Sequence, residues 1–319
     1  MQFDVLLAHA GPDSPGQPLF GSRWLTAWTV EPVPLAGALL AAALYLFGVH
    51  RMRAAGNPWP PVRTVMFLGP GLGSLLVATQ SALATYDTVL LSVHMVQHMV
   101  LAMITPIFLA LGAPVTLALR TLPPRGRATL LRIVQSRVAA VLTFPAVAGV
   151  LFVVNPFALY FSGLYEQTLR HPWLHDAMHV HFVLIGSLWF WSLLGIDPLP
   201  RRLSYPMRVI AAFATLPFHA FMGVAIMSAS TLIAGDWYTA QHREWGHSPQ
   251  ADQEWAGGIL WSSGDLIGLI VFAVLFKQWV RASEREAKRE DRRLDRIEAA
   301  ERARAAAPIA SAPEREEPT

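Results

Sequence analysis

Seven stretches of this 319-residue sequence are long and apolar enough to cross a lipid bilayer as helices, which leaves few folds open to the chain. A spanning helix needs about 20 mostly apolar residues. The stretches are 34–49, 63–84, 88–112, 138–161, 173–194, 207–233 and 255–280. Composition agrees, because 53% of the residues are hydrophobic and only 15% are charged, too few to cover a water-soluble fold. The sequence predicts an all-α, multi-pass membrane protein, a bundle of seven transmembrane helices.

The basic residues indicate how the bundle is oriented. Arginines are concentrated in alternate connections, whereas the connections between them carry at most one each. The arginine-rich connections contain Arg51, Arg53 and Arg63, then Arg120, Arg125, Arg127, Arg132 and Arg137, then Arg201, Arg202 and Arg208. Such connections remain on the cytoplasmic side of a cell membrane. We therefore expect the N-terminus outside the cytoplasm and the C-terminus inside.

The pattern divides the chain into three parts. Residues 1–33 form an extracytoplasmic segment without the basic and apolar regions of a cleaved signal peptide, and 34–280 form the transmembrane domain. Residues 281–319 are highly charged. Glu284 with Lys288 and Glu298 with Arg302 have the spacing of stabilising helical pairs. We expect a solvated cytoplasmic helix there, followed by a disordered end.

Composition also excludes several classes of function. The chain has no cysteine, so thiolate metal sites, iron–sulfur clusters and cysteine nucleophiles are ruled out. A net charge of +3 is too small to indicate nucleic-acid binding. No nucleophile–base arrangement or phosphate-binding glycine loop stands out. We therefore do not predict an enzyme.

Histidines gather toward the predicted outer side of the membrane. His94 and His98 are four residues apart on the third span, and His175 and His179 repeat that spacing on the fifth. Each pair presents both imidazoles on one helix face, one turn apart. Ionisable groups are costly in a bilayer and are usually retained for function. These four histidines are therefore the predicted metal ligands.

Other side chains could complete or orient this site. Imidazole suits copper, zinc and iron, and nearby thioethers shift the expectation toward copper as Cu(I) without excluding the other two metals. Methionine is also a common filler of apolar cores, and a single intramembrane histidine often makes only an interhelical hydrogen bond. The candidate auxiliary ligands or orienting groups are Met95, Met99, Asp176, His181, His219, Met222 and Asp265.

Several segments, spread over residues 61–280, together resemble one family. They are HMVQHMVLAMITPIFLALGAP (94–114), NPFALY (155–160), the HxxxHxH run (175–181), GVAIMSAS (223–230) and ADQEWAGGILWSSGDL (251–266). The sequence resembles the CtaG family of cytochrome c oxidase assembly factors of Gram-positive bacteria. An unrelated single-span copper chaperone bears the same name, but it relies on cysteines, which this chain lacks.

The resemblance implies a membrane protein needed to form active cytochrome c oxidase through copper supply to the oxidase. Its expected partners are oxidase subunits, the lipid bilayer and an extracytoplasmic copper donor. The residues leave three alternatives open. One is a transporter for copper or another ion, with His219, Asp265 and Met227 along its path. Another is a haem protein with two axial histidines, His94 or His98 with His179. The third is a di-iron oxygenase, although such enzymes carry their histidine boxes on the cytoplasmic face.

Overall fold

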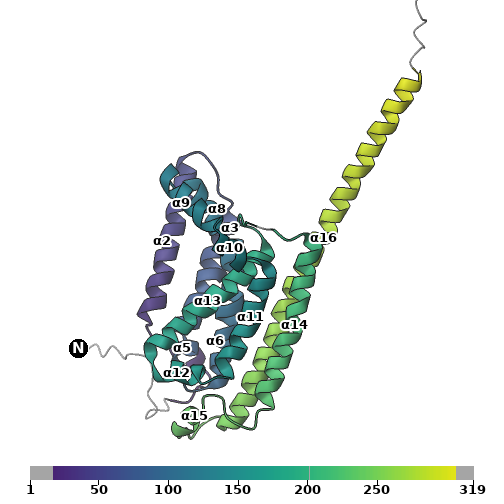
Figure 1. Cartoon of the computed structure of the whole chain (residues 1–319). Helices are drawn as coiled ribbons and strands as arrows, with labels where there is room; N and C mark the ends of the chain where they lie inside the picture. The colour runs from purple at the N-terminus through teal and green to yellow at the C-terminus, as the bar shows by residue number, and fades with distance from the viewer. Residues whose placement is uncertain (1–16, 201, 307–319) are drawn as a thin grey trace, which may run out of the picture.

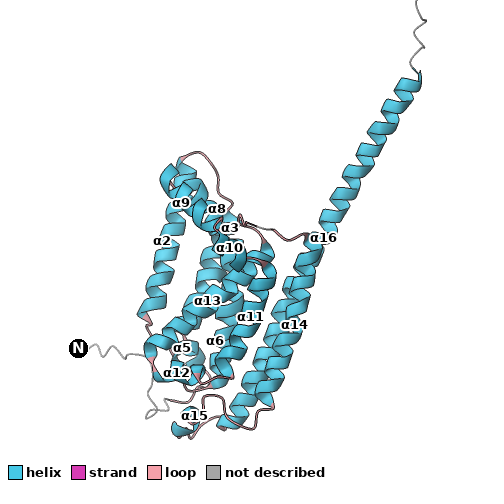
Figure 2. Ribbon diagram, viewed as in Figure 1, coloured by secondary structure: helices cyan, strands magenta, loops and turns pink. Residues whose placement is uncertain are grey.

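The computed structural model describes residues 17–200 and 202–306, and all regular secondary structure in these ranges is helical (Figures 1 and 2). The predictions for the first 16 residues and for the disordered end beyond 306 lie outside the described residues. The longer elements are α2 (Pro32–Ala54), α11 (Pro145–Tyr160), α13 (Pro172–Leu194), α14 (Tyr205–Met227) and α16 (Pro249–Ala306).

Shorter helices complete the chain. They are α1 (Arg23–Thr26), α3 (Pro61–Met66), α4 (Gly73–Gln80), α5 (Ala82–Tyr86), α6 (Leu91–Met99), α7 (Thr105–Leu111), α8 (Pro114–Thr121), α9 (Pro124–Val134), α10 (Arg137–Leu142), α12 (Leu164–Arg170) and α15 (Trp237–Ala240). Two π-helical segments, η1 (Phe67–Leu72) and η2 (Val100–Ile104), join α3 to α4 and α6 to α7.

Six helical stretches of the described chain are long and apolar enough to cross a membrane, and a seventh is formed if α11 and α12 are one span. These two helices meet at an angle of 67°. The all-helical multi-pass fold predicted from the sequence is confirmed, whereas its orientation stays a prediction. Several boundaries differ from expectation. The third span ends at Thr121 instead of Gly112, and the fourth begins at Pro145 instead of Val138. The sixth span ends at Met227 instead of Ile233, and the last span begins at Pro249 instead of Trp255.

The spans that approach the centre of the bundle pack unusually closely. A Cβ atom on Gly186 of α13 would lie 2.0 Å from the carbonyl oxygen of Ala102 in η2. Gly223 of α14 and Gly257 of α16 face each other in the same way, because a Cβ on either would lie within 2.6 Å of the other's carbonyl oxygen. Small residues let membrane helices approach backbone to backbone.

Side chains follow the division between bundle interior and lipid. Met95 of α6 and Phe182 of α13 are almost fully buried in the main core. On α2, by contrast, large apolar side chains such as Leu40, Leu44 and Phe47 are exposed on the outer surface of the bundle. A surface of this kind suits contact with lipid chains.

The charged tail is the direct continuation of the last span. Figure 1 shows α16 running alongside α14 and then projecting beyond the bundle, at the end where α8 and α9 lie. The predicted pair of Glu298 and Arg302 forms, with 3.1 Å between the carboxylate and the guanidinium. Because both side chains are exposed, such a pair contributes well under 1 kcal/mol.

Candidate metal centre

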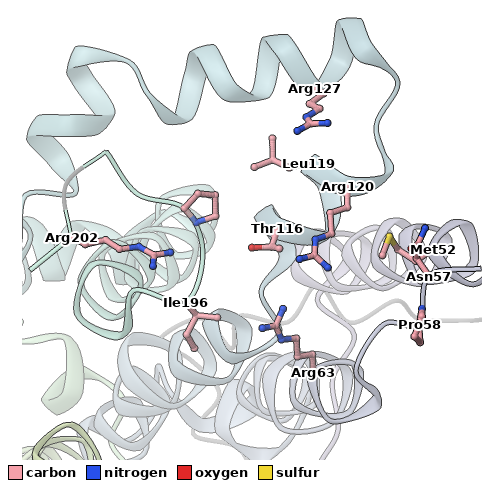
Figure 3. Close-up of a pocket in the computed structure, with 11 residues that line it drawn as sticks. Met52, Asn57, Pro58, Arg63, Thr116, Leu119, Arg120, Arg127, Ile196 and Arg202 are labelled. Carbon is pink, nitrogen blue, oxygen red and sulfur yellow. The ribbon is translucent and has the colours of Figure 1, made fainter. Parts of the chain in front are cut away.

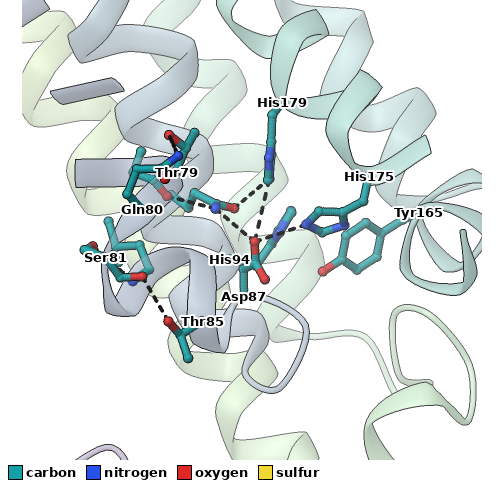
Figure 4. A network of polar contacts seen from close by, with 12 residues as sticks. Thr79, Gln80, Ser81, Thr85, Asp87, His94, Tyr165, His175 and His179 are labelled. Carbon is teal, nitrogen blue, oxygen red and sulfur yellow. Dashed lines mark hydrogen bonds and ion pairs between the residues drawn. The ribbon is translucent and has the colours of Figure 1, made fainter. Parts of the chain in front are cut away.

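Three buried side chains of metal-ligand type converge at the end of the bundle opposite α8 and α9 (Figures 1 and 4). They are Asp87, His175 and His179, and one ligand atom of each lies within 4.8 Å of the others. Nε2 of His175 is 3.1 Å from Oδ2 of Asp87, and Nε2 of His179 is 3.7 Å from the same oxygen. Because a carboxylate oxygen only accepts, His175 donates its Nε2 proton to Asp87.

Local structure explains why these groups meet. Asp87 is the residue after α5, in the short turn that leads to α6. His175 and His179 are near the start of α13, and their four-residue spacing brings the imidazoles edge to face, with ring centroids 4.6 Å apart. Figure 4 shows both imidazoles directed from α13 toward the carboxylate of Asp87. The cluster therefore joins α13 to the turn between α5 and α6.

Gln97 fixes the carboxylate and one imidazole relative to each other. Its amide nitrogen donates to Oδ2 of Asp87 at 2.9 Å and to the carbonyl of Ala78 at 3.0 Å. Its amide oxygen accepts from Nε2 of His179 at 3.0 Å. With both ends of the amide used, the side chain has one orientation. Gln97 therefore links α6 to His179 of α13 and to Asp87.

His94 and His98 share a different partner. Nε2 of His94 is 2.9 Å and Nδ1 of His98 is 2.7 Å from the hydroxyl oxygen of Tyr160. The ring of His98 also packs 4.1 Å from that of Phe182. The ring of His94 lies 6.1 Å from that of His175, so His94 borders the three-residue cluster. The structure thus brings His175 and His179 together with Asp87, and holds His98 against Tyr160.

The candidate auxiliary residues are dispersed. Three methionines, Met95, Met99 and Met222, are buried in the main core. Asp176 is half-buried and lines a cavity of about 260 Å³ beside His179.

Three other candidates make contacts elsewhere. His181 is exposed, with Nε2 2.6 Å from the side-chain oxygen of Asn155. His219 packs against Phe152 and Gly264, and Asp265 accepts a hydrogen bond from Trp261.

Electrostatics keep the central carboxylate ionised. Burial by itself would raise the pKa of Asp87, but the imidazoles of His175, His179 and His94 outweigh burial and hold the pKa at about 2. Asp87 therefore carries a negative charge in a buried position, where a charge is costly unless it is paired or coordinates a metal.

Two buried polar atoms in this region support the presence of a bound cation in the cluster. Oδ1 of Asp87 and Nδ1 of His94 have no hydrogen-bond partner within the described part of the chain. An unsatisfied buried polar atom costs about 1–3 kcal/mol. A carboxylate oxygen without a donor is a natural metal ligand, so the residues present fit a metal ion.

The donor set narrows the choice of metal. Two imidazoles and a carboxylate suit Cu(II), zinc or iron, whereas a preference for Cu(I) requires thioether sulfur. Three protein ligands also leave a coordination position open, as in sites that exchange or activate a ligand.

Sequence reasoning missed Asp87 and Gln97. Asp87 stands between two predicted spans and belongs to no recognisable motif. Gln97 lies between His94 and His98, so its position in a predicted span was a signal that a polar network crosses that helix. The depth of Asp87 could not be predicted, because a turn between spans is usually solvated.

Glu31, the residue before α2, makes the stability of the folded protein depend on pH. Burial, together with the charges of Asp176 and Asp87, raises the pKa of Glu31 to about 7 from 4.5. The folded state therefore keeps this proton where the unfolded chain has lost it, and stability falls as pH rises from about 4.5 to 7. Glu31→Gln is expected to raise the thermal unfolding midpoint at pH 8, through a stability gain of up to about 3 kcal/mol, with no gain at pH 4.5.

The control for this measurement is Glu254→Gln, which replaces an exposed carboxylate on α16. The prediction fails if Glu31→Gln shifts the midpoint equally at both pH values.

Comparison with known proteins places the chain in a family. Residues 43–282 match the family described as cytochrome c oxidase caa3 assembly factor, Caa3_CtaG. The chain belongs to this family. The matched range contains the whole Asp87–His175–His179 cluster and all the membrane spans except the start of α2 and the far part of α16. The resemblance seen in the sequence is thereby confirmed.

Relatives of this Caa3_CtaG chain occur in mycobacteria. It is 39% identical over 300 residues to uncharacterized proteins of Mycobacterium bovis, Mycobacterium tuberculosis and Mycobacterium leprae. The alignments cover 92% of this chain but 45% of each relative, so the chain spans about half the length of those proteins. No solved structure matches the chain.

Proposed function

We propose that this chain promotes assembly of cytochrome c oxidase by binding a copper ion at the Asp87–His175–His179 cluster and supplying it to the oxidase. The observation that carries the proposal is the convergence of three buried ligand-type side chains from α13 and from the turn between α5 and α6. The family match supports the link to the oxidase. In this role copper is cargo, and the protein catalyses no reaction.

Each residue has a distinct task in this proposal. The imidazoles of His175 and His179 hold the ion, and the carboxylate of Asp87 balances its charge. Gln97 orients both His179 and Asp87 through its two hydrogen bonds. His94 borders the cluster, with its Nε2 held by Tyr160 and its Nδ1 without a hydrogen-bond partner among the described residues.

The position of the cluster suits delivery outside the cytoplasm. It lies at the end of the bundle opposite α8 and α9, the helices that carry the arginine-rich third connection (Figure 1). Arginine-rich connections favour the cytoplasmic side, which supports an outward-facing cluster. An extracytoplasmic donor and the oxidase subunits would then meet the copper site on the same side of the membrane.

A complementation experiment tests this function. A strain lacking the gene is expected to regain oxidase activity, and copper in the purified oxidase, when the wild-type chain is expressed. Asp87→Asn keeps the side-chain size but removes the charge, so both readouts are expected to stay at the level of the deletion strain. His181→Ala, on the same helix as the ligands but turned toward Asn155, should restore them. Full restoration by Asp87→Asn, at equal protein level in the membrane, would refute the proposal.

A further inference from the structure

A large cavity opens at the end of the bundle opposite the metal-ligand cluster. It has a volume of about 740 Å³. Its walls come from the end of α2, the start of α3, helices α8 and α9, and the connection from α13 to α14. Four of the residues that line it are arginines, Arg63, Arg120, Arg127 and Arg202, and none is acidic. Figure 3 shows Arg63, Arg120 and Arg202 directed into a common space with Arg127 above it.

These arginines are not neutralised by the described part of the protein. No carboxylate there lies within 4.0 Å of any of the four guanidinium groups, since the ion pairs of the described residues involve other side chains. Four like charges around one cavity repel each other. The arrangement is therefore suited to an anion supplied from outside the chain.

Asp197, whose chain neighbours Ile196 and Pro198 line the cavity, has a carboxylate that is already fully hydrogen-bonded elsewhere. Asp197 is 1% exposed and accepts hydrogen bonds from the backbone N–H groups of Val115 and Thr116, at 3.3 and 2.7 Å. It also accepts from the indole of Trp191 at 2.9 Å. Asp197 thus caps the first turn of α8, and Arg202 reaches only its backbone carbonyl, at 3.2 Å.

A buried aromatic residue sets the positions of two arginines. The guanidinium carbons of Arg63 and Arg120 lie 5.0 and 6.0 Å from the centre of the Trp59 ring. Trp59 is 3% exposed and donates its indole N–H to the hydroxyl of Tyr45 at 3.0 Å. Tyr45 in turn stacks on Phe67 with ring centres 4.1 Å apart. Two of the cationic groups therefore rest on a rigid, packed floor.

Membrane topology explains why arginines are found at this end of the bundle, but it does not explain why they converge. Orientation requires only a surplus of basic residues in the connections. Arg51 and Arg53 supply such charge from exposed positions that do not line the cavity. Arginine forks bind phosphate oxygens in pairs, and basic pockets between membrane helices on the cytoplasmic side bind anionic headgroups.

We propose that this cavity binds the phosphate of an anionic phospholipid headgroup. The cavity lies where the apolar helices end, which is the depth of the headgroups. Its apolar lining residues, among them Met52, Leu119 and Ile196, suit the glycerol and the start of the acyl chains. The phosphate of the bound lipid places a negative charge among the four arginines and so contacts α3, α8, α9 and the α13–α14 connection at once.

Binding of short-chain lipids to the purified full-length chain in detergent tests the proposal. Dioctanoyl phosphatidylglycerol should bind to the wild type, whereas the zwitterionic dioctanoyl phosphatidylcholine should bind at least about tenfold more weakly. The double variant Arg63→Gln with Arg120→Gln should weaken phosphatidylglycerol binding at least about tenfold. The matched control, Arg51→Gln with Arg53→Gln, removes the same charge from the same end and should bind like the wild type.

Other outcomes would overturn the proposal. Equal weakening in both double variants would mean that only bulk charge is sensed. Tighter binding of sodium pyrophosphate than of phosphatidylglycerol by the wild type would assign the cavity to a soluble anion instead. If the cavity double variant does not fold, Arg127→Gln serves in its place. Its side chain is exposed on α9, so we expect a folded protein with about fivefold weaker binding, and unchanged binding would contradict the proposal.

Discussion

Replacing His175 and His179 together by alanine is expected to reduce copper bound to the purified protein to less than about a tenth of the wild-type content. The variant removes two of the three buried ligand-type groups of the cluster and leaves Asp87 alone. Loss of even an orienting neighbour of a metal ligand costs about 10–100-fold in affinity, and loss of two ligands should cost more. The measurement is metal content per chain after loading with copper and removal of excess.

Two single histidine variants, His181→Ala and His98→Ala, provide the comparison. His181→Ala should retain copper, because that imidazole contacts Asn155. His98→Ala should also retain most of the copper, since His98 is held by Tyr160 and Phe182, whereas a four-histidine site would lose it. Normal copper content in the double variant His175→Ala, His179→Ala would rule out the cluster as the copper-binding site.

Among the glycine-to-alanine substitutions, each of which adds one methyl group, Gly186→Ala is expected to destabilise the bundle most. The added Cβ would lie 2.0 Å from the carbonyl oxygen of Ala102 and 2.8 Å from the ring of Pro106, so α13 and η2 must separate. Overpacking of a dense interior typically costs about 1–3 kcal/mol, and a clash with backbone leaves less room for relief, so we expect a loss of at least about 3 kcal/mol. Thermal unfolding of the purified protein in detergent measures the effect.

Gly37→Ala on α2 is the control for added helix propensity and volume. A Cβ there meets no atom within 4 Å, so its unfolding midpoint should equal or exceed that of the wild type. Because α13 carries His175 and His179, Gly186→Ala should also weaken copper binding in whatever fraction remains folded. A stable Gly186→Ala protein would show that α13 and η2 do not pack as closely as described.

The general fold could be predicted because apolar runs of about 20 residues have few alternatives in a membrane protein. Local departures from regular α-helix could not be predicted. The π-helical segment η1 surrounds Pro70, and η2 ends just before Pro106, where a missing N–H disturbs the regular hydrogen bonds. Such segments depend on how neighbouring spans pack. The sequence predicts a last span and a separate charged helix, because the composition changes near Arg281. The structure has one continuous helix, α16, across that point.

The histidine pairs could be predicted for a related reason. Four-residue spacing places two imidazoles on one helix face, and both HxxxH pairs do lie on such faces. The sequence contains no information on the rotation of α6 relative to α13, which directs His98 to Tyr160 and leaves His175 and His179 facing Asp87. The carboxylate that sequence reasoning did not identify, Asp87, comes from a turn. The depth of that turn in the bundle depends on tertiary packing.

X-ray absorption at the copper edge of the copper-loaded wild-type protein tests the central claim most directly. The account predicts one copper per chain with two imidazoles and a carboxylate oxygen, and no sulfur scatterer. It also predicts that Asp87→Asn changes the spectrum. A shell of four imidazoles, a sulfur ligand from methionine, or a Soret band from haem in place of copper would contradict it.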